Sequence, residues 1–484
     1  MEKDTTSNQK LHSDHALLCL IGQKCRQLHL LDPLHQLVKI DQKTVEHSPT
    51  DKLQDGLLAI MCGAEAVYQI NTLLRSDPAV SRAFGRERCA DQSTIQQTLS
   101  ACTPTNVLEM QTVLKIIFQK TSRAITHAFA KGPLIVDIDI TGLPCGRHLE
   151  GAEKGYFADC KPGTTGRQLY RASASQYDEL IYQKVCPGNI GSSQLSVFQA
   201  VMTAVWDILK LTAKDKDRVL IRLDSGYGTT DIINYLWAEG YQFITKLFAT
   251  SRARKLGRAV EAAAWSEDPC HQGRAYSYLT QAHPYTGGER SLHQIAVRCK
   301  LGEKSKAKRV EQAAAKAAKT GKSQVADEYQ YSVLIVSSAE LAQLAKLEQA
   351  QLLSQLHFYD ARATIESASI RGDKQGLKLV KRHPQAGTRQ SLCGQEMLIL
   401  LAQLAHNLIV WARGWLGAIE PKLAEYGIKR WVRDLLTMKG RLTFKAGQIV
   451  KVRLGRLHEL ARRFFAPLAT FGGQLGVRLI LDET

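Results

Sequence analysis

The sequence predicts an α/β protein in which a mixed β-sheet is covered by helices. Two observations indicate this fold class. An apolar run with strand alternation, "PLIVDIDIT", begins at residue 133. Two further apolar strands, "RVLIRLD" and "YQFITKL", then alternate with helical segments. Strands that alternate with helices along a chain usually form a sheet with helices packed on its faces.

The first part of the chain, residues 1–130, is predicted to be helical. Its segment "DKLQDGLLAIMCGAEAVYQINTLL" has apolar positions three and four apart, and "DPAVSRAFG" and "TPTNV" supply loop and helix-cap signals. No strand pattern is evident in this region, so we expect a separate helical N-terminal region.

The predicted sheet occupies residues 131–249 and 331–417. The first of these parts holds the three strands named above and the helices "SQLSVFQAVMTAVWDILKLT" and "TTDIINYLWAEG". The second part begins with the strand "YQYSVLIVSS" and continues into the helix "AELAQLAKLEQAQLLSQL". Residues 250–330 interrupt the alternation with two strand-like runs and a basic segment. We therefore expect a β-rich basic insertion there and a basic C-terminal region at 418–484.

The charge of the chain points to a polyanionic partner. The formal net charge is +18. Between Arg413 and Arg463 there are 13 Lys and Arg residues against four acids, which is half of the total excess. Solvated helix faces explain most single charge runs. Two basic runs in one strongly basic chain favour nucleic acid, because Lys and Arg that neutralise phosphates release condensed counterions.

Composition argues against a membrane protein, a secreted protein and a zinc protein. No run reaches the roughly 18–20 apolar residues that a membrane span needs, and the N-terminus is polar rather than a signal peptide. The 11 cysteines include no C-x-x-C pair, so we expect buried reduced thiols. We predict a cytoplasmic protein without membrane partners.

Three acids at the ends or on the faces of core elements are candidates for metal-dependent chemistry: Asp139, Asp224 and Glu366. Carboxylates are preferred ligands of Mg²⁺ and Mn²⁺, and two such ions can support an in-line phosphoryl displacement. Each acid also has an ordinary structural explanation. An Asp at a strand end often caps a turn, and Glu366 follows Arg362 by four residues, as in an intrahelical ion pair.

Taken in order, these motifs resemble the DDE transposases of bacterial insertion sequences, in the branch with a β-rich insertion between the second Asp and the Glu. The resemblance rests on "DIDIT", "IRLDSGYG" and Tyr359-x-x-Arg362-x-x-x-Glu366. It is extended by "SDPAVSRAFGRERCADQSTIQQTLS", "KGYFADCKPGTTGRQLYRAS", "CPGN" and "QLAHNLIVW". Together the matching segments cover about residues 70–415.

The resemblance implies a ribonuclease H-like core, a DDE triad that binds two Mg²⁺ or Mn²⁺ ions, and transposition of an element bounded by inverted repeats. Its partners would be double-stranded DNA, both element ends and target, and a second copy of the chain in the DNA complex. The helical N-terminal region would bind DNA, and the C-terminal region would bind DNA or dimerise. The first Asp of the family precedes a threonine by two positions, which corresponds to Asp139. Asp137 points to the same face, so it stays open as a substitute or auxiliary.

The resemblance also implies DNA-binding residues. Tyr359 and Arg362 match positions that contact phosphate near the cleaved end. The family's lysine lies seven residues after the Glu, but that position is Asp373 here, and Lys374 is offset from Glu366 by about 80° on a regular helix. From the charge pattern, we further expect Lys429, Arg430 and Arg433 to follow the DNA backbone.

Two alternatives stay open at this point. D-x-D-x-T after an apolar strand is also the signature of haloacid-dehalogenase-type phosphohydrolases, in which Asp137 would be the nucleophile and Asp139 the general acid. That alternative leaves Glu366 and the charge unexplained. The other is a DNA-binding descendant of a transposase that has lost catalysis.

Overall fold

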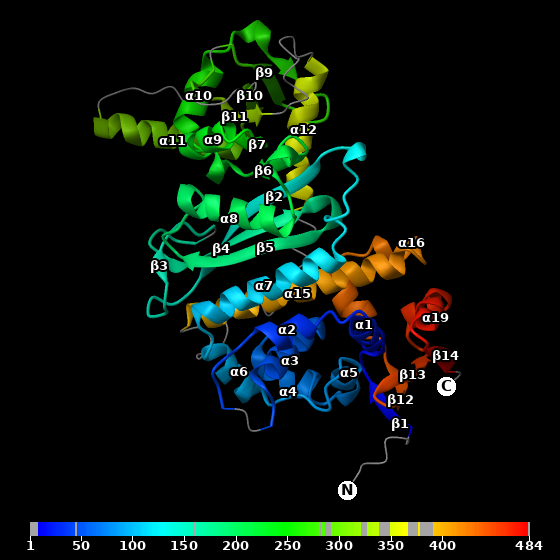
Figure 1. The fold of residues 1–484 in the computed structure, drawn as a ribbon. Coiled ribbons are helices and arrows are strands. Elements are labelled where there is room, and N and C mark those ends of the chain that lie inside the picture. The colour runs from blue at the N-terminus through cyan, green and yellow to red at the C-terminus, as the bar shows by residue number, and fades with distance from the viewer. Residues whose placement is uncertain are drawn as a thin grey trace. The chain divides into compact units, whose positions relative to one another are not determined.

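The structure is a computed structural model, and it divides into two compact units that are described separately (Figure 1). Unit 1 comprises residues 1–126, 140–190 and 365–484, and unit 2 comprises residues 127–139 and 191–364. The described residues are 8–43, 46–158, 160–280, 282–285, 292–320, 327–337, 349–365, 376–377 and 391–482.

Unit 2 contains a mixed sheet whose strands run in the order β2-β6-β7-β11-β10-β9-β8. Strands β2, β6 and β7 are parallel, whereas β11, β10, β9 and β8 add to them as antiparallel neighbours. The strands are β2 (Leu134–Pro144, whose last residues belong to unit 1), β6 (Val219–Leu223), β7 (Gln242–Lys246), β8 (Ser266–Glu267), β9 (Arg274–Tyr278), β10 (Leu292–Lys300) and β11 (Tyr329–Ser337).

Helices cover both faces of this sheet. The helices of unit 2 are α8 (Leu195–Ile208), α9 (Thr230–Ala238), α10 (Thr250–Arg258), α11 (Glu303–Thr320) and α12 (Gln349–Ile365). Leu352, Leu356 and Tyr359 of α12 pack on Leu334 and Val336 of β11. Helix α10 packs on Tyr331, which is three residues before Leu334 and therefore lies on the opposite face of β11. Burial on both faces explains why "SVLIVS" is apolar without alternation.

The insertion does not form a separate body in the described residues, because its strands β9 and β10 pair with each other and with β11 of the core. The predicted strands at 274–279 and 291–301 thus correspond to β9 and β10. The predicted helix at 339–356 is described only from Gln349 onward.

Unit 1 is built around the long helix α15 (Leu392–Gly417), which packs on α3, α7 and the strand β5. Its helices are α1 (Ala16–Gln27), α2 (Asp32–Leu37), α3 (Pro49–Met61), α4 (Ile70–Leu73), α5 (Pro78–Ala83), α6 (Gln92–Ser100), α7 (Pro104–Thr121), α15, α16 (Pro421–Ala424), α17 (Ile428–Arg430), α18 (Glu459–Arg463) and α19 (Phe465–Gln474). Capping boxes at Ser48 and Thr103 fix the starts of α3 and α7, as the loop and cap signals predict.

Helix α15 is long and apolar enough to cross a membrane, but 89% of its apolar window is buried within the protein. Its polar residues bond to the start of β5 (Glu179–Pro187). Asn407 accepts a hydrogen bond from the amide of Leu180 at 2.9 Å and donates one to its carbonyl at 2.8 Å. Trp411 donates to the buried carboxylate of Glu179 at 3.0 Å. The burial and these bonds identify α15 as a core helix.

The strands of unit 1 form two groups. One is the hairpin of β4 (Thr165–Ala174) and β5 (Glu179–Pro187), with the short β3 (Glu153–Lys154) on β4. The other is a four-stranded sheet in the order β1-β12-β13-β14, formed by β1 (Gln9–Ser13), β12 (Gly440–Lys445), β13 (Gln448–Gly455) and β14 (Arg478–Asp482). The expectation that the N-terminal region has no strand is therefore wrong at β1.

The cysteines are all free thiols, as predicted, but not all of them are buried. Cys160, Cys270 and Cys299 are exposed.

Candidate functional site

The candidate active site lies at the carboxyl ends of β6 and β7, where the parallel pairing of β2 with β6 also ends, although β2 itself continues to Pro144. In the register of β2 and β6, Asp137 pairs with Arg222 and Ile138 pairs with Leu223. Asp139 and Asp224 are the next residues on these neighbouring strands, which lie about 4.8 Å apart. The structure thus brings together two of the three acids that the sequence predicts.

The same register extends to a third strand. Arg222 pairs with Ile244 of β7, so the position beside Asp224 is Lys246. We call Asp139, Asp224 and Lys246 the strand-end row. Because side chains two apart on a strand share a face, the row lies on the face that α12 covers. The Lys246 ammonium lies 4.7 Å from the ring centroid of Tyr359 on that helix.

Asp224 is held by a tight turn, "SGYG", that follows β6. Its Oδ1 accepts a hydrogen bond from the amide of Gly226 at 2.8 Å, and its carbonyl accepts one from Thr245 at 2.8 Å. A Cβ at Gly228 would lie 1.7 Å from the carbonyl oxygen of Lys246, so only glycine fits there. The predicted turn-cap role of Asp224 is thus confirmed, through its Oδ1.

Asp137 and Asp139 share a face but have different environments. Both oxygens of Asp137 accept from Arg222, at 2.6 and 2.9 Å, and its side chain is only 7% exposed. Asp139 accepts from Arg362 at 3.0 Å, and its side chain is 19% exposed. Asp137 therefore anchors a buried ion pair, whereas Asp139 lies where a substrate or ion can reach it.

The predicted DNA-contacting residues of α12 are largely buried. Tyr359 and Arg362 are 7% and 8% exposed, and Tyr359 is part of the apolar core between α12 and the sheet. The contact of Arg362 with Asp139 places its guanidinium beside the strand-end row. Glu366 and Lys374 lie outside the described residues. Glu366 is the first residue after α12 in the sequence.

The predicted cations of the C-terminal region are exposed near one acid. Arg433 bonds to Asp434 at 2.7 Å, and Arg430 lies 3.8 Å from the same carboxylate and stacks on Tyr426. Lys429 is exposed in α17. Their roles in DNA binding stay predictions.

Lys246 is the residue of this site that the sequence analysis missed. Burial lowers the pKa of its ammonium below the ordinary value of a lysine. A lysine that ends the third parallel strand was a usable signal, because parallel strands end at one edge of a sheet and ligands bind at that edge.

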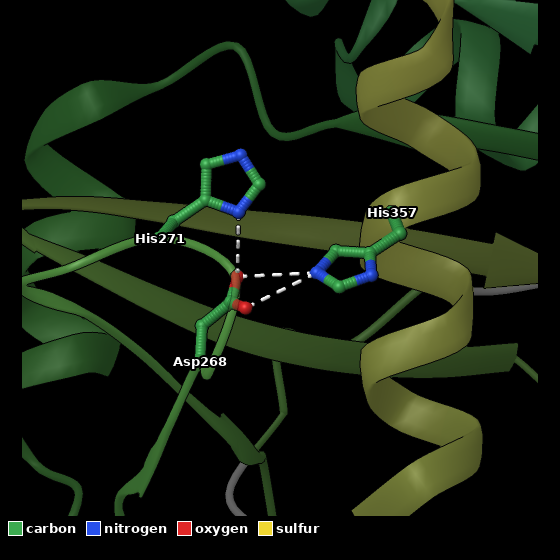
Figure 2. Close-up of side chains that lie close together, drawn as sticks. All are labelled: Asp268, His271 and His357. Carbon is green, nitrogen blue, oxygen red and sulfur yellow. Dashed lines mark hydrogen bonds and ion pairs between the residues drawn. The ribbon is translucent and has the colours of Figure 1, made fainter.

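A second charged cluster in unit 2 surrounds Asp268, in the turn between β8 and β9 (Figure 2). His357 of α12 lies 3.1 Å from Oδ1 of Asp268, and His271 lies 3.2 Å from Oδ2. Arg274 bonds to Asp268 through Nε at 2.6 Å and also to Asp360 of α12.

The Asp268 cluster has the donors for a metal ion, since its three ligand atoms lie within 4.8 Å of one another. Its bonding does not favour one. The amide of Cys270 and the guanidinium of Arg274 already donate to the two oxygens of Asp268, so Arg274 serves as the cation. Burial alone would raise the pKa of Asp268, but these hydrogen bonds, with that of His357, lower it to about 2. The cluster is a hydrogen-bonded clamp between α12 and the turn.

The strand-end row fits hard divalent cations better. Its acids offer oxygen ligands on neighbouring strands, and no sulfur or imidazole nitrogen is among the row residues. Asp139 and Asp224 are therefore the described residues that could hold Mg²⁺ or Mn²⁺.

Comparison with known proteins identifies the family. Residues 5–468 match the family described as "Transposase DDE domain group 1". The chain belongs to this DDE transposase family. No curated protein matches it.

Two solved structures are similar to the chain. One is the piggyBac transposase synaptic complex with hairpin DNA, with 11% identity, a TM-score of 0.42, and coverage of 89% of this chain and 82% of that chain. The other is a pre-cleavage Mos1 transpososome, with 10% identity, a TM-score of 0.16, and coverage of 42% of this chain and 62% of that chain.

Family membership confirms the resemblance stated from the motifs. The predicted mixed sheet flanked by helices is confirmed as well. This DDE transposase is thus a DNA transposase by family, and the phosphohydrolase alternative loses its basis because Asp137 is bound on both oxygens by Arg222.

Proposed function

We propose that this DDE transposase catalyses metal-dependent strand cleavage and strand transfer at the inverted-repeat ends of an insertion sequence. The observation that carries the proposal is the strand-end row, which sets two reachable carboxylates side by side on parallel strands in a chain of this family.

In this proposal, Asp139, Asp224 and Glu366 hold two Mg²⁺ or Mn²⁺ ions. Ions bound there would activate an attacking oxygen and stabilise the leaving oxygen of a phosphodiester. The protein residues position these groups. Arg362 fixes the carboxylate of Asp139 through its 3.0 Å contact, and the Gly226 amide fixes that of Asp224.

Lys246 and Arg362 supply positive charge beside the two acids. In the proposal they attract the scissile phosphate and balance the negative charge of the carboxylates. We further infer that the partner is duplex DNA, that two copies of the chain act together on it, and that the protein works in the bacterial cytoplasm. The net charge of +18 supports the polyanionic partner.

Cleavage of a duplex that carries the DNA flanking the coding region tests the proposal. Asp139→Ala, Asp224→Ala and Glu366→Ala should each abolish cleavage in Mg²⁺ while binding of that duplex persists. Loss of cleavage in Asp137→Ala but not in Asp139→Ala would refute the assignment.

Two further outcomes would refute the function itself. Turnover of a small phosphomonoester that Asp137→Asn abolishes would indicate a phosphohydrolase. A folded wild-type protein that binds the duplex but cleaves it in neither Mg²⁺ nor Mn²⁺ would be a non-catalytic descendant.

A further inference from the structure

The four-stranded sheet of unit 1 has one apolar and one basic face. Leu442 and Phe444 of β12 and Val452 and Leu454 of β13 are buried. This inner face packs against α1 and α19. Alternation along each strand turns the intervening residues to the other face.

The outer face carries two rows of basic residues that cross the strands. In one row His12, Arg441 and Arg453 are register partners, and in the other Lys10, Thr443, Lys451 and Arg478 are. We call these two rows the basic sheet face. All of its basic residues are exposed except Lys451, which is half-buried. The rows are about 6.7 Å apart along the strands, and their members are about 4.8 Å apart across them.

The charges on this face oppose one another across the strands. Arg441 lies directly opposite Arg453, and Lys451 lies directly opposite Arg478. Like charges in such cross-strand pairs destabilise a sheet. Among the described residues, Asp482 is the acid that pairs with this face, and its carboxylate lies 3.8 Å from Arg453.

Protection of sheet edges does not explain the pattern. Lysines on edge strands discourage pairing with other chains, which could account for Lys10 on β1 and Arg478 on β14. Arg441, Lys451 and Arg453 lie on the two central strands, where there is no edge to protect. A charge arrangement that costs stability at the centre of a sheet indicates an anionic partner.

The basic sheet face also differs from the predicted cations of the same region. Arg430 and Arg433 share Asp434, which neutralises part of their charge. Two aromatic residues interleaved with this region, Trp431 and Phe444, are buried and cannot stack on bases. The basic sheet face therefore carries more positive charge without an acidic partner than Arg430 and Arg433 do.

We propose that the basic sheet face binds the phosphate backbone of duplex DNA without reading its sequence. The partner class rests on the proposed function. The basic side chains offer charged donors that suit phosphate oxygens, and such contacts position the DNA rather than specifying its sequence. The N-terminal strand β1 thereby contributes to a surface that the sequence places at 418–484.

The test measures the affinity of the full chain for a duplex of mixed sequence across a salt series. The sheet variant combines Arg441→Gln, Lys451→Gln, Arg453→Gln and Arg478→Gln. Each lost phosphate contact should reduce the slope of log K against log salt by about 0.9, so the slope falls by about 3.6 if all four contacts are real. Affinity at low salt should fall at least about tenfold.

A matched control removes the same charge elsewhere. Lys131→Gln, Lys210→Gln, Lys214→Gln and Arg218→Gln change exposed basic residues of unit 2 that lie outside both basic runs. This control should leave the slope unchanged. A further variant with Arg441→Lys, Arg453→Lys and Arg478→Lys keeps the charges and should keep the slope. Thermal unfolding checks the fold, and the sheet variant should melt no lower than wild type because the like-charge pairs are gone.

Three outcomes would overturn the inference. The sheet variant could keep the wild-type slope, or the control could lose as much as the sheet variant. The sheet variant could also dissociate a dimer in sedimentation without a change in DNA affinity, in which case the face binds a second copy. A wild-type protein that binds no duplex would instead refute the proposed function.

Discussion

The strand-end row and the Asp268 cluster both hold aspartates beside α12 in unit 2, but they differ in how far their carboxylates are bonded. Asp268 receives hydrogen bonds from Cys270, Arg274 and His357, and its side chain is fully buried. Asp139 lies partly exposed beside Arg362. Asp268, which is surrounded by His and Arg side chains, therefore has a structural role, because its oxygens already accept hydrogen bonds.

The largest expected effect is on the rate of DNA cleavage, which should depend on the strand-end row and not on Asp268. Asp139→Asn and Asp224→Asn should each lower the cleavage rate about 10³-fold or more, because losing an anionic ligand removes several kcal/mol of transition-state stabilisation. Asp268→Asn should keep most of the activity per folded molecule. Single-turnover cleavage with each purified variant measures this difference.

Metal binding gives an independent measurement of the same contrast. Mg²⁺ should raise the melting temperature of the wild type and of Asp268→Asn, but not that of the Asp139→Asn/Asp224→Asn double variant. Chelation of the metal should abolish wild-type cleavage. An equal increase in melting temperature in all three proteins would indicate that Mg²⁺ binds outside the strand-end row.

The next effect is on stability. Asp268→Ala leaves Arg274 with Asp360 as its acidic partner and should cost about 3 kcal/mol in the free energy of unfolding, near the lower end for a broken buried ion pair. Asp224→Ala should cost less, because Asp224 is partly exposed and caps a turn. Denaturant unfolding of both variants measures the ranking, and the reverse order would contradict the comparison.

Acid should weaken the Asp268 cluster in a defined window. The pKa of Asp268 is lowered to about 2 from 3.8, so its contribution to stability is present above pH 3.8 and is lost as the pH falls toward 2. The loss amounts to about 2 kcal/mol. Unfolding curves of wild type and Asp268→Asn should converge over this window; curves that stay parallel would show that Asp268 is not stabilised by its bonds.

The smallest effect concerns Lys246. Lys246→Met should lower the cleavage rate about 10- to 100-fold, as expected for the loss of one charged contact of about 1.5–3 kcal/mol. Stability should not fall, because burial already disfavours the charged lysine. The folded pKa is below the unfolded value of 10.5, so wild-type stability should rise as the pH approaches 10.5, and Lys246→Met should lose this rise. Lower stability of Lys246→Met with an unchanged cleavage rate would indicate a structural role for Lys246.

The sequence predicts the strands of the site well, because β2, β6 and β7 are short apolar runs that end at polar residues. The positions of Asp139 and Asp224 can be predicted because these acids come directly after the apolar runs. The roles of Asp137 and Asp139 cannot be separated by alternation, since both point to the same face. Their difference comes from Arg222, a cross-strand partner 85 positions away in the sequence.

Other features depend on contacts that no local pattern reveals. The strand β1, "QKLHS", is short and mostly polar, and it forms because β12 supplies its partner. The Asp268 cluster joins a turn to a helix nearly 90 residues later. Propensity and periodicity describe neighbours along the chain, so such pairings escape them.

The pairing of β1 with β12 also determines when the four-stranded sheet can form during translation. Gln9 lies opposite Phe444, so β1 leaves the ribosome long before its partner strand exists. At about 5–20 residues per second, the delay is on the order of half a minute or more. During that interval the sheet cannot form, and a prematurely terminated chain that lacks β12 never acquires it. The sheet can therefore be completed only after translation has passed residue 444. Pairing between strands so distant in the sequence also predicts slow folding of unit 1.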